Sequence, residues 1–246
     1  MSTEINDVER GGEVAGRTLV LGDIHGAYKA LVQVLDRCGF NRERDRLIFL
    51  GDVADGWPET CRCIDALLSI PNLVALIGNH DEWFREWAES YRAERAWLQQ
   101  GGTATLESYS SPNQVPDSHR AYLKRAKLWY EEDGRMFVHG GWDWRVSPHP
   151  MGVPGSITWD RELWATARAR RIGQITAFRE VYIGHTDVTR FGSEGPMHCC
   201  EIWNMDTGAG WAGRLSIMDV ETKEVWQSDL VADLYPQHSG RIRRAS

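Results

Sequence analysis

The sequence lacks the features of membrane and exported proteins. No apolar run approaches the roughly 20 residues that span a bilayer, so we expect no transmembrane helix. The first 16 residues are polar and acidic, which is typical of neither a signal peptide nor a transit peptide. An excess of positive charge is also missing, since 28 Lys and Arg face 35 Asp and Glu and the net charge is −7. We therefore expect no dedicated nucleic-acid surface, because phosphate backbones favour basic proteins.

Cysteine is too sparse to form a disulfide framework. The chain has five cysteines, an odd number, and two pairs of them are adjacent or nearly so in the sequence. No C-x-x-C spacing is present, so a zinc ribbon or a dithiol redox site is not expected. Without an export signal, free thiols in a reducing cytoplasm are the expected state. We accordingly expect a cytoplasmic protein.

The composition indicates one globular domain. Hydrophobic residues make up 42% of the 246 positions and charged residues 26%, which excludes collagen-like, coiled-coil and wholly disordered chains. We find no internal repeat and no linker between domains. We expect one folded domain over residues 17–235, a flexible N-terminal tail over residues 1–16 and a flexible basic C-terminal tail over residues 236–246.

Short apolar runs alternate with helical patterns along the first third of the chain. Strands are predicted at 18–21, 47–50 and 73–77, and helices from Tyr28 to a stop at Gly39 and from Thr60 to Leu68. This order predicts βαβ units and an α/β fold with parallel strand pairs. Later strands are predicted at 135–138, 181–183, 201–205, 214–219 and 224–227, with a helix at 162–172.

Aromatic residues at helical spacing predict two helices in the middle of the chain. One stripe contains Trp83, Trp87 and Tyr91. A second contains Tyr122, Ala126, Trp129 and Tyr130. We interpret both stripes as core packing.

Five predicted strands end in motifs rich in metal-binding side chains. The motifs are GDIHG at 22–26, GDVADG at 51–56, GNHD at 78–81, VHGG at 138–141 and IGHT at 183–186. In open α/β sheets, ligands bind at the carboxyl ends of the strands. The motifs therefore bring one set of side chains to one edge of the fold: Asp23, His25, Asp52, Asn79, His80, His139 and His185.

This set predicts a two-metal site. Carboxylate and imidazole ligands without a thiolate suit Mn, Fe, Zn, Ni or Co. Two ions about 3.5–4 Å apart need a bridging carboxylate, and Asp52 follows a central strand. Asp23 and His25 would hold the first ion. The second ion would be held by Asn79, His139 and His185.

The motif series resembles the metallophosphoesterase (calcineurin-like) superfamily. Within it, the series is similar to the phosphoprotein phosphatase branch, with the bacterial and lambda-phage-type Ser/Thr protein phosphatases and the symmetrical diadenosine tetraphosphatases. The resemblance runs from about Leu19 to Leu215 and includes W-L-x-x-G-G at 97–102, W-D-R-E at 159–162 and D-T-G at 206–208. Asp187 stands where other branches have a second histidine. The resemblance implies a single metallophosphatase-like β-sandwich of mixed sheets flanked by helices.

The resemblance also implies roles for individual residues. The metal ligands would be those named above, with Asp52 as the bridge. His80 matches the family's general acid, and Asp55 matches the carboxylate that orients it; a histidine held in this way is a competent acid near neutral pH. Arg161 matches an arginine that clamps phosphate oxygens, a task that suits the guanidinium fork.

Two positions depart from the family pattern. Gly56 replaces a second clamp arginine. Either another residue supplies that charge, with Arg145 and Arg190 as the candidates, or the substrate is held differently. Trp57, the next residue, either lines the substrate pocket or packs beneath its loop. Asp81 replaces a glutamate, and we expect it to have a local structural role.

The expected function is metal-dependent phosphoester hydrolysis. We expect phosphomonoesters to be cleaved by direct attack of a metal-bound hydroxide, as in a Ser/Thr protein phosphatase, with two divalent ions, Mn²⁺ first. Cleavage of a dinucleoside polyphosphate or a nucleic-acid phosphate is the alternative, and a non-catalytic metal-binding module is a third reading. The expected partner is a phosphorylated protein or a small phosphoester, with no membrane. The sequence does not indicate an oligomeric state.

Overall fold

Two five-stranded sheets form the centre of the molecule. The computed structural model describes residues 16–152 and 154–241. The first sheet has the order β10 (Val225–Gln227), β9 (Ser216–Asp219), β1 (Thr18–Leu21), β2 (Arg46–Phe49) and β3 (Leu73–Ala75). The second has the order β4 (Trp129–Glu132), β5 (Arg135–Val138), β6 (Glu180–Ile183), β8 (Ile202–Asn204) and β7 (Met197–Cys199).

Both sheets are mixed, with parallel strands in the middle. Strands β1, β2 and β3 are parallel, and β9 and β10 extend the sheet in antiparallel fashion beyond β1. In the second sheet β5, β6 and β8 are parallel, whereas β4 and β7 pair antiparallel at the two edges. Because parallel neighbours end on the same side, the loops after β1, β2 and β3 meet at one edge, as do those after β5 and β6.

Alternating residues of the central strands of the first sheet fill the two cores on either side of it. Val20 and Ile48 face inward and pack against Phe137 and Tyr182 of the other sheet, whose rings stack with centroids 5.0 Å apart. The residues between them, such as Leu19, Leu21 and Leu47, face the outer helices. Strands buried on both faces read as continuous apolar runs, which is why the sequence shows them clearly.

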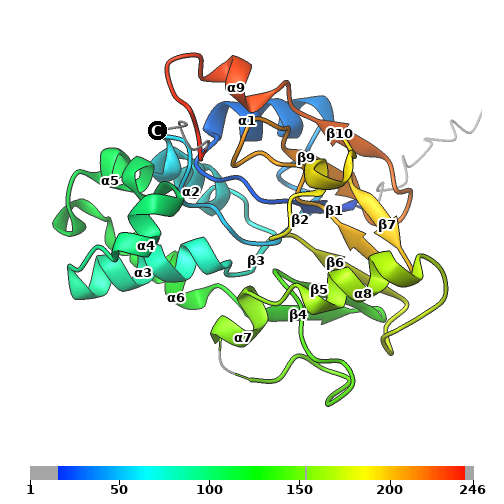
Figure 1. Cartoon of the computed structure of the whole chain (residues 1–246). Coiled ribbons are helices and arrows are strands. Elements are labelled where there is room, and N and C mark those ends of the chain that lie inside the picture. The colour runs from blue at the N-terminus through cyan, green and yellow to red at the C-terminus, as the bar shows by residue number, and fades with distance from the viewer. Residues whose placement is uncertain (1–15, 153, 242–246) are drawn as a thin grey trace, which may run out of the picture.

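Helices cover the outer faces of both sheets (Figure 1). Helix α1 (Tyr28–Arg37) and α2 (Thr60–Leu68) bury their apolar faces in the core outside the first sheet, and α8 (Glu162–Arg170) does so against the second. A layer of further helices lies at the left of Figure 1: α3 (Asn79–Ser90), α4 (Arg95–Trp97), α5 (Thr103–Tyr109) and α6 (Asp117–Arg125). Two short helices complete the fold, α7 (Pro154–Thr158) and α9 (Val231–Leu234). The predicted β-sandwich of mixed sheets flanked by helices is confirmed.

Two details of the predicted elements were wrong. Trp129 and Tyr130 do not continue a helix, because α6 stops at Arg125 and β4 pairs them with Val138 and Phe137. Tyr91 lies just beyond α3 with a left-handed φ of 64° and is 56% exposed, so it takes no part in the core stripe. The edge strands β4 and β7 were not predicted. Aromatic residues at short spacing suit a half-buried strand as well as a helix, so periodicity alone did not separate the two.

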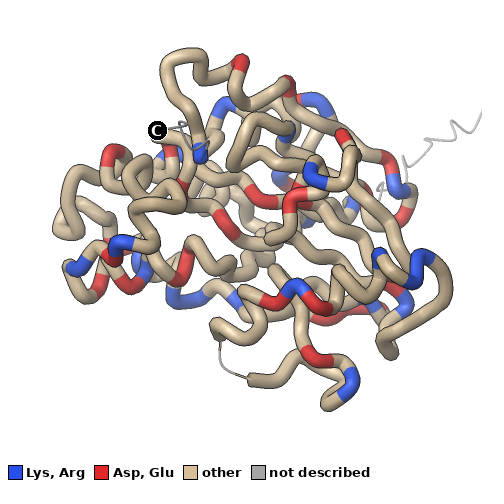
Figure 2. The backbone as a smooth tube through the Cα atoms, in the orientation of Figure 1, with Lys and Arg blue, Asp and Glu red and all other residues tan. Residues whose placement is uncertain are grey.

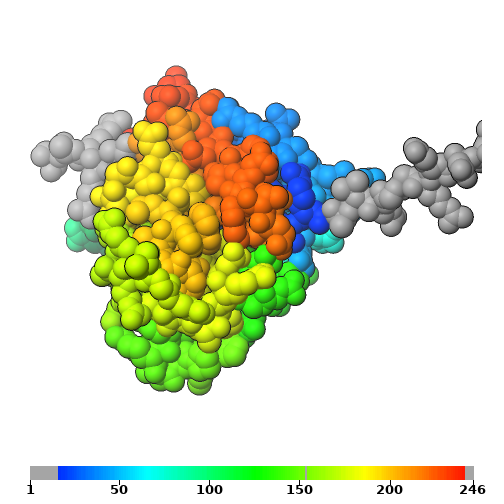
Figure 3. Space-filling view, turned by 90° about the vertical axis from the view of Figure 1, so that its right-hand side faces the viewer, coloured from blue at the N-terminus to red at the C-terminus, as the bar shows by residue number. Residues whose placement is uncertain are grey.

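The end of the described chain returns to the domain. After α9, residues 236–241 run back over the molecule, and the backbone N–H of Arg241 donates to Gly210 O at 3.0 Å. This segment belongs to the predicted C-terminal tail, of which residues 242–246 lie outside the described residues, as do residues 1–15 of the N-terminal tail. In Figure 3 the C-terminal part of the chain, orange to red, packs beside blue α1.

All five cysteines are free thiols. Within residues 16–152 and 154–241, none of the helices has the length and apolar character that crossing a bilayer requires.

Candidate metal centre

The segments that follow five strands deliver the predicted ligands to one place. Asp23 and His25 follow β1, Asp52 follows β2, His139 follows β5 and His185 follows β6. Asn79 is the first residue of α3, the helix that follows β3. Positive φ angles occur at several of these positions and at Asp55, namely 51° at His25, 60° at Asp52, 72° at Asp55 and 65° at His185. Residues held in this strained region concentrate at functional sites.

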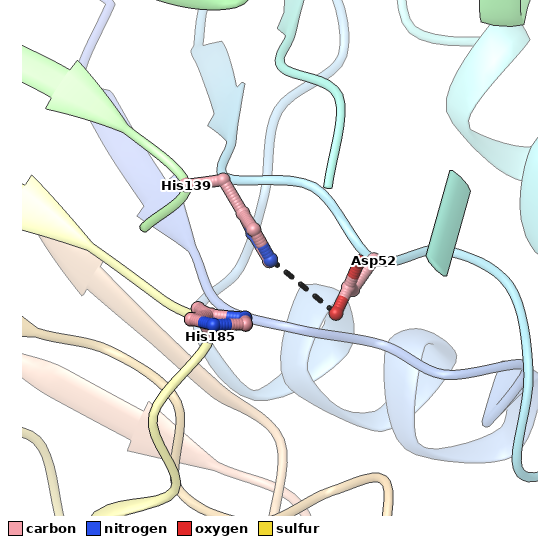
Figure 4. A group of neighbouring side chains, drawn as sticks. All are labelled: Asp52, His139 and His185. Atoms are coloured by element: carbon pink, nitrogen blue, oxygen red, sulfur yellow. Dashed lines mark ion pairs between the residues drawn. The ribbon is translucent and has the colours of Figure 1, made fainter. Parts of the chain in front are cut away.

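Asp52 lies at the centre of this arrangement. Its Oδ2 is 3.3 Å from His139 Nε2 and 3.6 Å from His25 Nε2. Its Oδ1 accepts a hydrogen bond from the backbone N–H of His80 at 2.9 Å. Figure 4 shows the Asp52 carboxylate directed at the His139 ring, with His185 beside them. The carboxylate is thus shared between two groups of donor atoms.

The first donor group consists of Asp23, His25 and Asp52, whose ligand atoms lie within 4.8 Å of one another. Asp23 Oδ2 accepts from the backbone N–H of His185 at 3.0 Å, whereas its buried Oδ1 has no hydrogen-bond partner. His25 Nδ1 is 3.0 Å from Ala54 O, so it carries the proton that this carbonyl accepts. That tautomer leaves the lone pair of His25 Nε2 facing the two carboxylates.

The second donor group consists of Asp52, His139 and His185, again within 4.8 Å. His139 Nδ1 lies 2.9 Å from Leu50 O, which directs Nε2 to the carboxylate and to Asn79 Oδ1 at 3.2 Å. His185 Nε2 is buried and has no hydrogen-bond partner. Two buried polar atoms without partners, one in each group, and a donor set of carboxylate, imidazole and amide oxygen fit divalent cations. The structure brings all six predicted ligands together.

The centre has an electrostatic deficit that cations would correct. Figure 2 shows acidic positions in the loops at the middle of the molecule. Burial, followed by the negative charge of Asp206, raises the pKa of Asp23 well above its usual value. Burial alone would lower the pKa of His139, but attraction to Asp52 outweighs it and raises this pKa to about 10. Without cations, protons therefore supply the positive charge.

Metal binding should consequently release protons. A divalent ion at His139 must displace a proton that is held up to about pH 10, so metal affinity should rise as pH increases toward that value. One displaced proton corresponds to about a tenfold gain in affinity per pH unit. Calorimetric titration of the stripped protein with Mn²⁺ in two buffers of different ionisation enthalpy measures the released protons directly. An affinity that is independent of pH between 6.5 and 8 would contradict this expectation.

His80 and Asp55 form a buried pair beside the centre. His80 Nδ1 is 2.6 Å from Asp55 Oδ2, and both side chains are almost fully buried. Two further residues hold the carboxylate: Trp97 Nε1 donates to Oδ2 at 2.8 Å and Thr105 Oγ1 donates to Oδ1 at 2.7 Å. Neither was predicted to belong to the site, although Trp97 opens the W-L-x-x-G-G motif. A carboxylate with three donors has one orientation, and it fixes the His80 ring in turn.

Asp81 holds the loop that carries Asp52. Its carboxylate accepts hydrogen bonds from the backbone N–H groups of Asp52, Val53 and Gly78 at 2.8, 2.8 and 3.0 Å. Burial and the nearby charge of Asp52 raise the pKa of Asp81 to about 7. This role is structural, as the sequence indicated.

Arginine side chains lie around the centre. Arg161, at the N-terminus of α8, is solvent-exposed. Its guanidinium carbon is 6.0 Å from the ring centroid of Trp159, and the Trp159 and His185 ring centroids are 5.7 Å apart. Shielding of part of its side chain, and then the positive charges of Arg190 and Arg241, lower the pKa of Arg161. Arg145 instead donates to Asp143 and Glu162 at 2.8 Å each on the surface, so its charge is already paired.

Trp57 packs in the core. It is fully buried, its Nε1 donates to Ala209 O at 2.7 Å, and its ring stacks on Tyr235 with centroids 5.2 Å apart. Of the two roles considered for Trp57, packing beneath the loop is the one that this burial supports. A buried indole has no face left for a substrate.

Truncation of Trp57 should therefore destabilise the whole domain. Trp57→Ala would remove a side chain with no exposed surface and leave a cavity, which costs about 3–5 kcal/mol in the free energy of unfolding. Urea unfolding followed by circular dichroism measures this loss. The half-buried Trp226 of β10 provides the matched control, since Trp226→Ala should cost less. Equal costs for the two substitutions would show that Trp57 does not anchor the core.

A second cluster of metal-binding residues lies elsewhere in the fold. Cys61, Asp65 and His119 place their donor atoms within 4.8 Å of one another. Both ring nitrogens of His119 are already hydrogen-bonded, Nδ1 to Tyr109 Oη at 2.8 Å and Nε2 to Asp65 Oδ1 at 2.9 Å. We interpret this cluster as structural.

Comparisons with known proteins agree with this geometry. Residues 16–188 match the family model described as calcineurin-like phosphoesterase. The chain is 25% identical over 209 residues to a serine/threonine-protein phosphatase 1 of Salmonella typhimurium, covering 82% of this chain and 91% of that protein. It is 26% identical to a symmetrical bis(5'-nucleosyl)-tetraphosphatase of Pseudomonas fluorescens, covering 84% and 92%. A crystal structure of a metallophosphoesterase from Sphaerobacter thermophilus shares the fold, with a TM-score of 0.54, 19% identity and coverage of 91% and 93%.

Proposed function

Because the chain belongs to the calcineurin-like phosphoesterase family and is thus a hydrolase of phosphoester bonds, we propose that it cleaves phosphomonoesters, with Ser/Thr phosphoproteins as the substrate class. The position of Asp52 carries this proposal. One carboxylate is shared by two donor groups, and the His80–Asp55 pair stands beside it. This arrangement suits the in-line displacement of an alcohol from phosphorus.

The site would hold two divalent cations, and we propose Mn²⁺. Asp23, His25 and Asp52 would hold one ion, and Asp52, Asn79, His139 and His185 the other. When bound, the ions would neutralise phosphoryl oxygens and lower the pKa of a water molecule. We place the reaction in the cytoplasm, a location that the five free cysteines support.

The residues of the chain itself would position and protonate the substrate. Asp55 holds His80 Nδ1, so Nε2 is the ring nitrogen that can give a proton to the departing oxygen. The Arg161 guanidinium would hold the equatorial oxygens of the phosphoryl group. Asp81 keeps the Asp52 loop in place while charge develops on the substrate.

An aromatic wall beside the site favours a second substrate class. The ring centroid of Trp83 is 5.2 Å from that of His80 and 4.9 Å from that of Trp159. The ring centroids of Trp159 and His185 are 5.7 Å apart. Both indoles are half-buried, so part of each is open to a ligand. Stacking on such rings stabilises a nucleobase by about 1–3 kcal/mol. A dinucleoside polyphosphate is therefore the alternative substrate, and the Pseudomonas fluorescens relative carries that activity in its name.

A comparison of kcat/KM values separates the two substrate classes. The Mn²⁺-loaded protein is assayed for kcat/KM on phosphoserine and phosphothreonine peptides and on diadenosine tetraphosphate, with Trp159→Ala beside the wild type. A higher value on the peptides that Trp159→Ala leaves unchanged supports the phosphoprotein substrate. A higher value on the dinucleotide that Trp159→Ala lowers about tenfold or more supports the alternative. No hydrolysis of any phosphoester would overturn both.

A further inference from the structure

A different arginine occupies the space beside Gly56, where the family resemblance places a clamp arginine. Gly56 has a φ of +101°, a conformation that favours glycine. A Cβ built there would lie 3.3 Å from Cγ of Arg241, and one on Gly101 would lie 3.0 Å from the same atom. The stem of Arg241 therefore passes over these two glycines, 185 positions along the sequence from Gly56.

Trp57 anchors the segment that brings Arg241 to this place. The Trp57 ring stacks on Tyr235, just after α9, and a Cβ built on Gly240 would lie 2.6 Å from its Cζ2. The backbone N–H of Arg241 then donates to Gly210 O at 3.0 Å. Gly56 thus stands where the family pattern has an arginine, and Trp57 beside it packs against the segment that carries Arg241.

The Arg241 guanidinium lies at the metal centre. Its Nη1 is 3.3 Å from His25 Nε2, the nitrogen that faces Asp23 and Asp52. Its guanidinium carbon is 4.8 Å from the Trp211 ring, and its buried Nε has no hydrogen-bond partner. Among residues 16–152 and 154–241, no carboxylate forms an ion pair with Arg241. A guanidinium with donors to spare beside a phosphoesterase centre is suited to an anion.

We infer that Arg241 is the second phosphate-binding arginine of this enzyme, acting with Arg161 on the oxygens of the phosphoryl group. The inference rests on the proposed function for the nature of that group. Once His25 Nε2 is given to a cation, the guanidinium loses this acceptor and its N–H donors become free for phosphate oxygens. The C-terminal segment then serves as part of the substrate site.

Binding of inorganic phosphate tests the inference without requiring turnover. The full-length Mn²⁺-loaded protein is titrated with phosphate by calorimetry, as wild type, Arg241→Ala, Arg241→Lys and Arg145→Ala. We expect Arg241→Ala to weaken phosphate binding about 10- to 100-fold, the effect of a charged hydrogen bond. The phosphate affinity of Arg241→Lys should lie between those of the wild type and Arg241→Ala, since the point charge of an ammonium replaces the guanidinium fork. Arg145→Ala, which removes an arginine paired on the surface, should match the wild type.

Three further readouts distinguish phosphate binding by Arg241 from other roles. Metal content and melting temperature should be the same in all four proteins. Added guanidinium ion should restore part of the phosphate affinity of Arg241→Ala and of no other variant. Unchanged phosphate affinity in Arg241→Ala would overturn the inference. Tighter Mn²⁺ binding without loss of phosphate affinity would also overturn it, because Arg241 would then only block His25 Nε2 from the cation.

The same proteins separate this inference from the proposed function. If the wild type hydrolyses no phosphoester yet Arg241→Ala still loses phosphate affinity, the proposed function fails and the assignment of Arg241 as an anion-binding residue stands. If the wild type is active and Arg241→Ala keeps both its phosphate affinity and its KM, the assignment of Arg241 fails and the proposed function stands.

Discussion

Asp52→Asn is expected to reduce phosphoester hydrolysis by at least about 10³-fold while leaving the fold intact. The substitution keeps the size of the side chain and an oxygen for the His80 backbone N–H, but it removes the charge that both donor groups share. A metal pair contributes several kcal/mol to stabilising the transition state, and each 1.36 kcal/mol is tenfold in rate. Steady-state hydrolysis of an aryl phosphomonoester after reloading with Mn²⁺ measures the loss.

Asp45→Asn is the matched control for this experiment. Asp45 precedes β2 and is also buried, but it pairs with Arg17 at the opposite end of the strand from Asp52. Its replacement should lower stability modestly and leave the rate per folded molecule unchanged. Metal content, measured by mass spectrometry, should fall in Asp52→Asn alone. Near-full activity of Asp52→Asn would contradict the proposed two-metal mechanism.

His80→Gln is expected to lower the rate by an amount that depends on the leaving group. If His80 protonates the departing oxygen, an alkyl phosphate should suffer the full 10²–10⁴-fold loss typical of a general acid. A nitrophenyl phosphate, whose leaving oxygen needs no proton, should lose much less. The slope of log kcat against leaving-group pKa, measured over a series of phosphomonoesters, reports this difference.

Asp55→Asn tests the assignment of His80 as the proton donor indirectly, through the carboxylate that holds its ring. Asp55 contacts His80 and not the donor groups, so its replacement should give a smaller loss with the same dependence on leaving group. Trp97 and Thr105 would still hold the amide in place. An equal loss across all leaving groups in His80→Gln would mean that His80 positions the centre and does not supply the proton.

The centre was predictable because each ligand lies within a few residues of a buried strand. A short apolar run fixes a strand, and the strand fixes where its loop emerges. Parallel neighbours then bring Asp23 and Asp52 to one edge of the first sheet, and His139 and His185 to one edge of the second. The residues that hold the ligands were harder to predict. Thr105 bonds Asp55 from 50 positions away, and no local pattern indicates that distance.

Arg241 illustrates the limit of local patterns more clearly. Its segment shows no apolar periodicity and was interpreted as a loose tail. The arginine reaches His25 because Trp57, Tyr235 and Gly240 pack together, a contact between segments that are far apart in the sequence. The missing arginine at Gly56 left open whether another residue supplies that charge, and only the structure places Arg241 beside Gly56.

The origin of the ligands has a mechanical consequence. The strands before Asp23 and Asp52 belong to the first sheet, and those before His139 and His185 belong to the second. A cation held by Asp52, His139 and His185 is therefore a cross-link between the two halves of the sandwich. Sliding of one sheet over the other would have to break that link as well as the core that the sheets share, so the loaded protein should resist a pulling force better than the stripped protein.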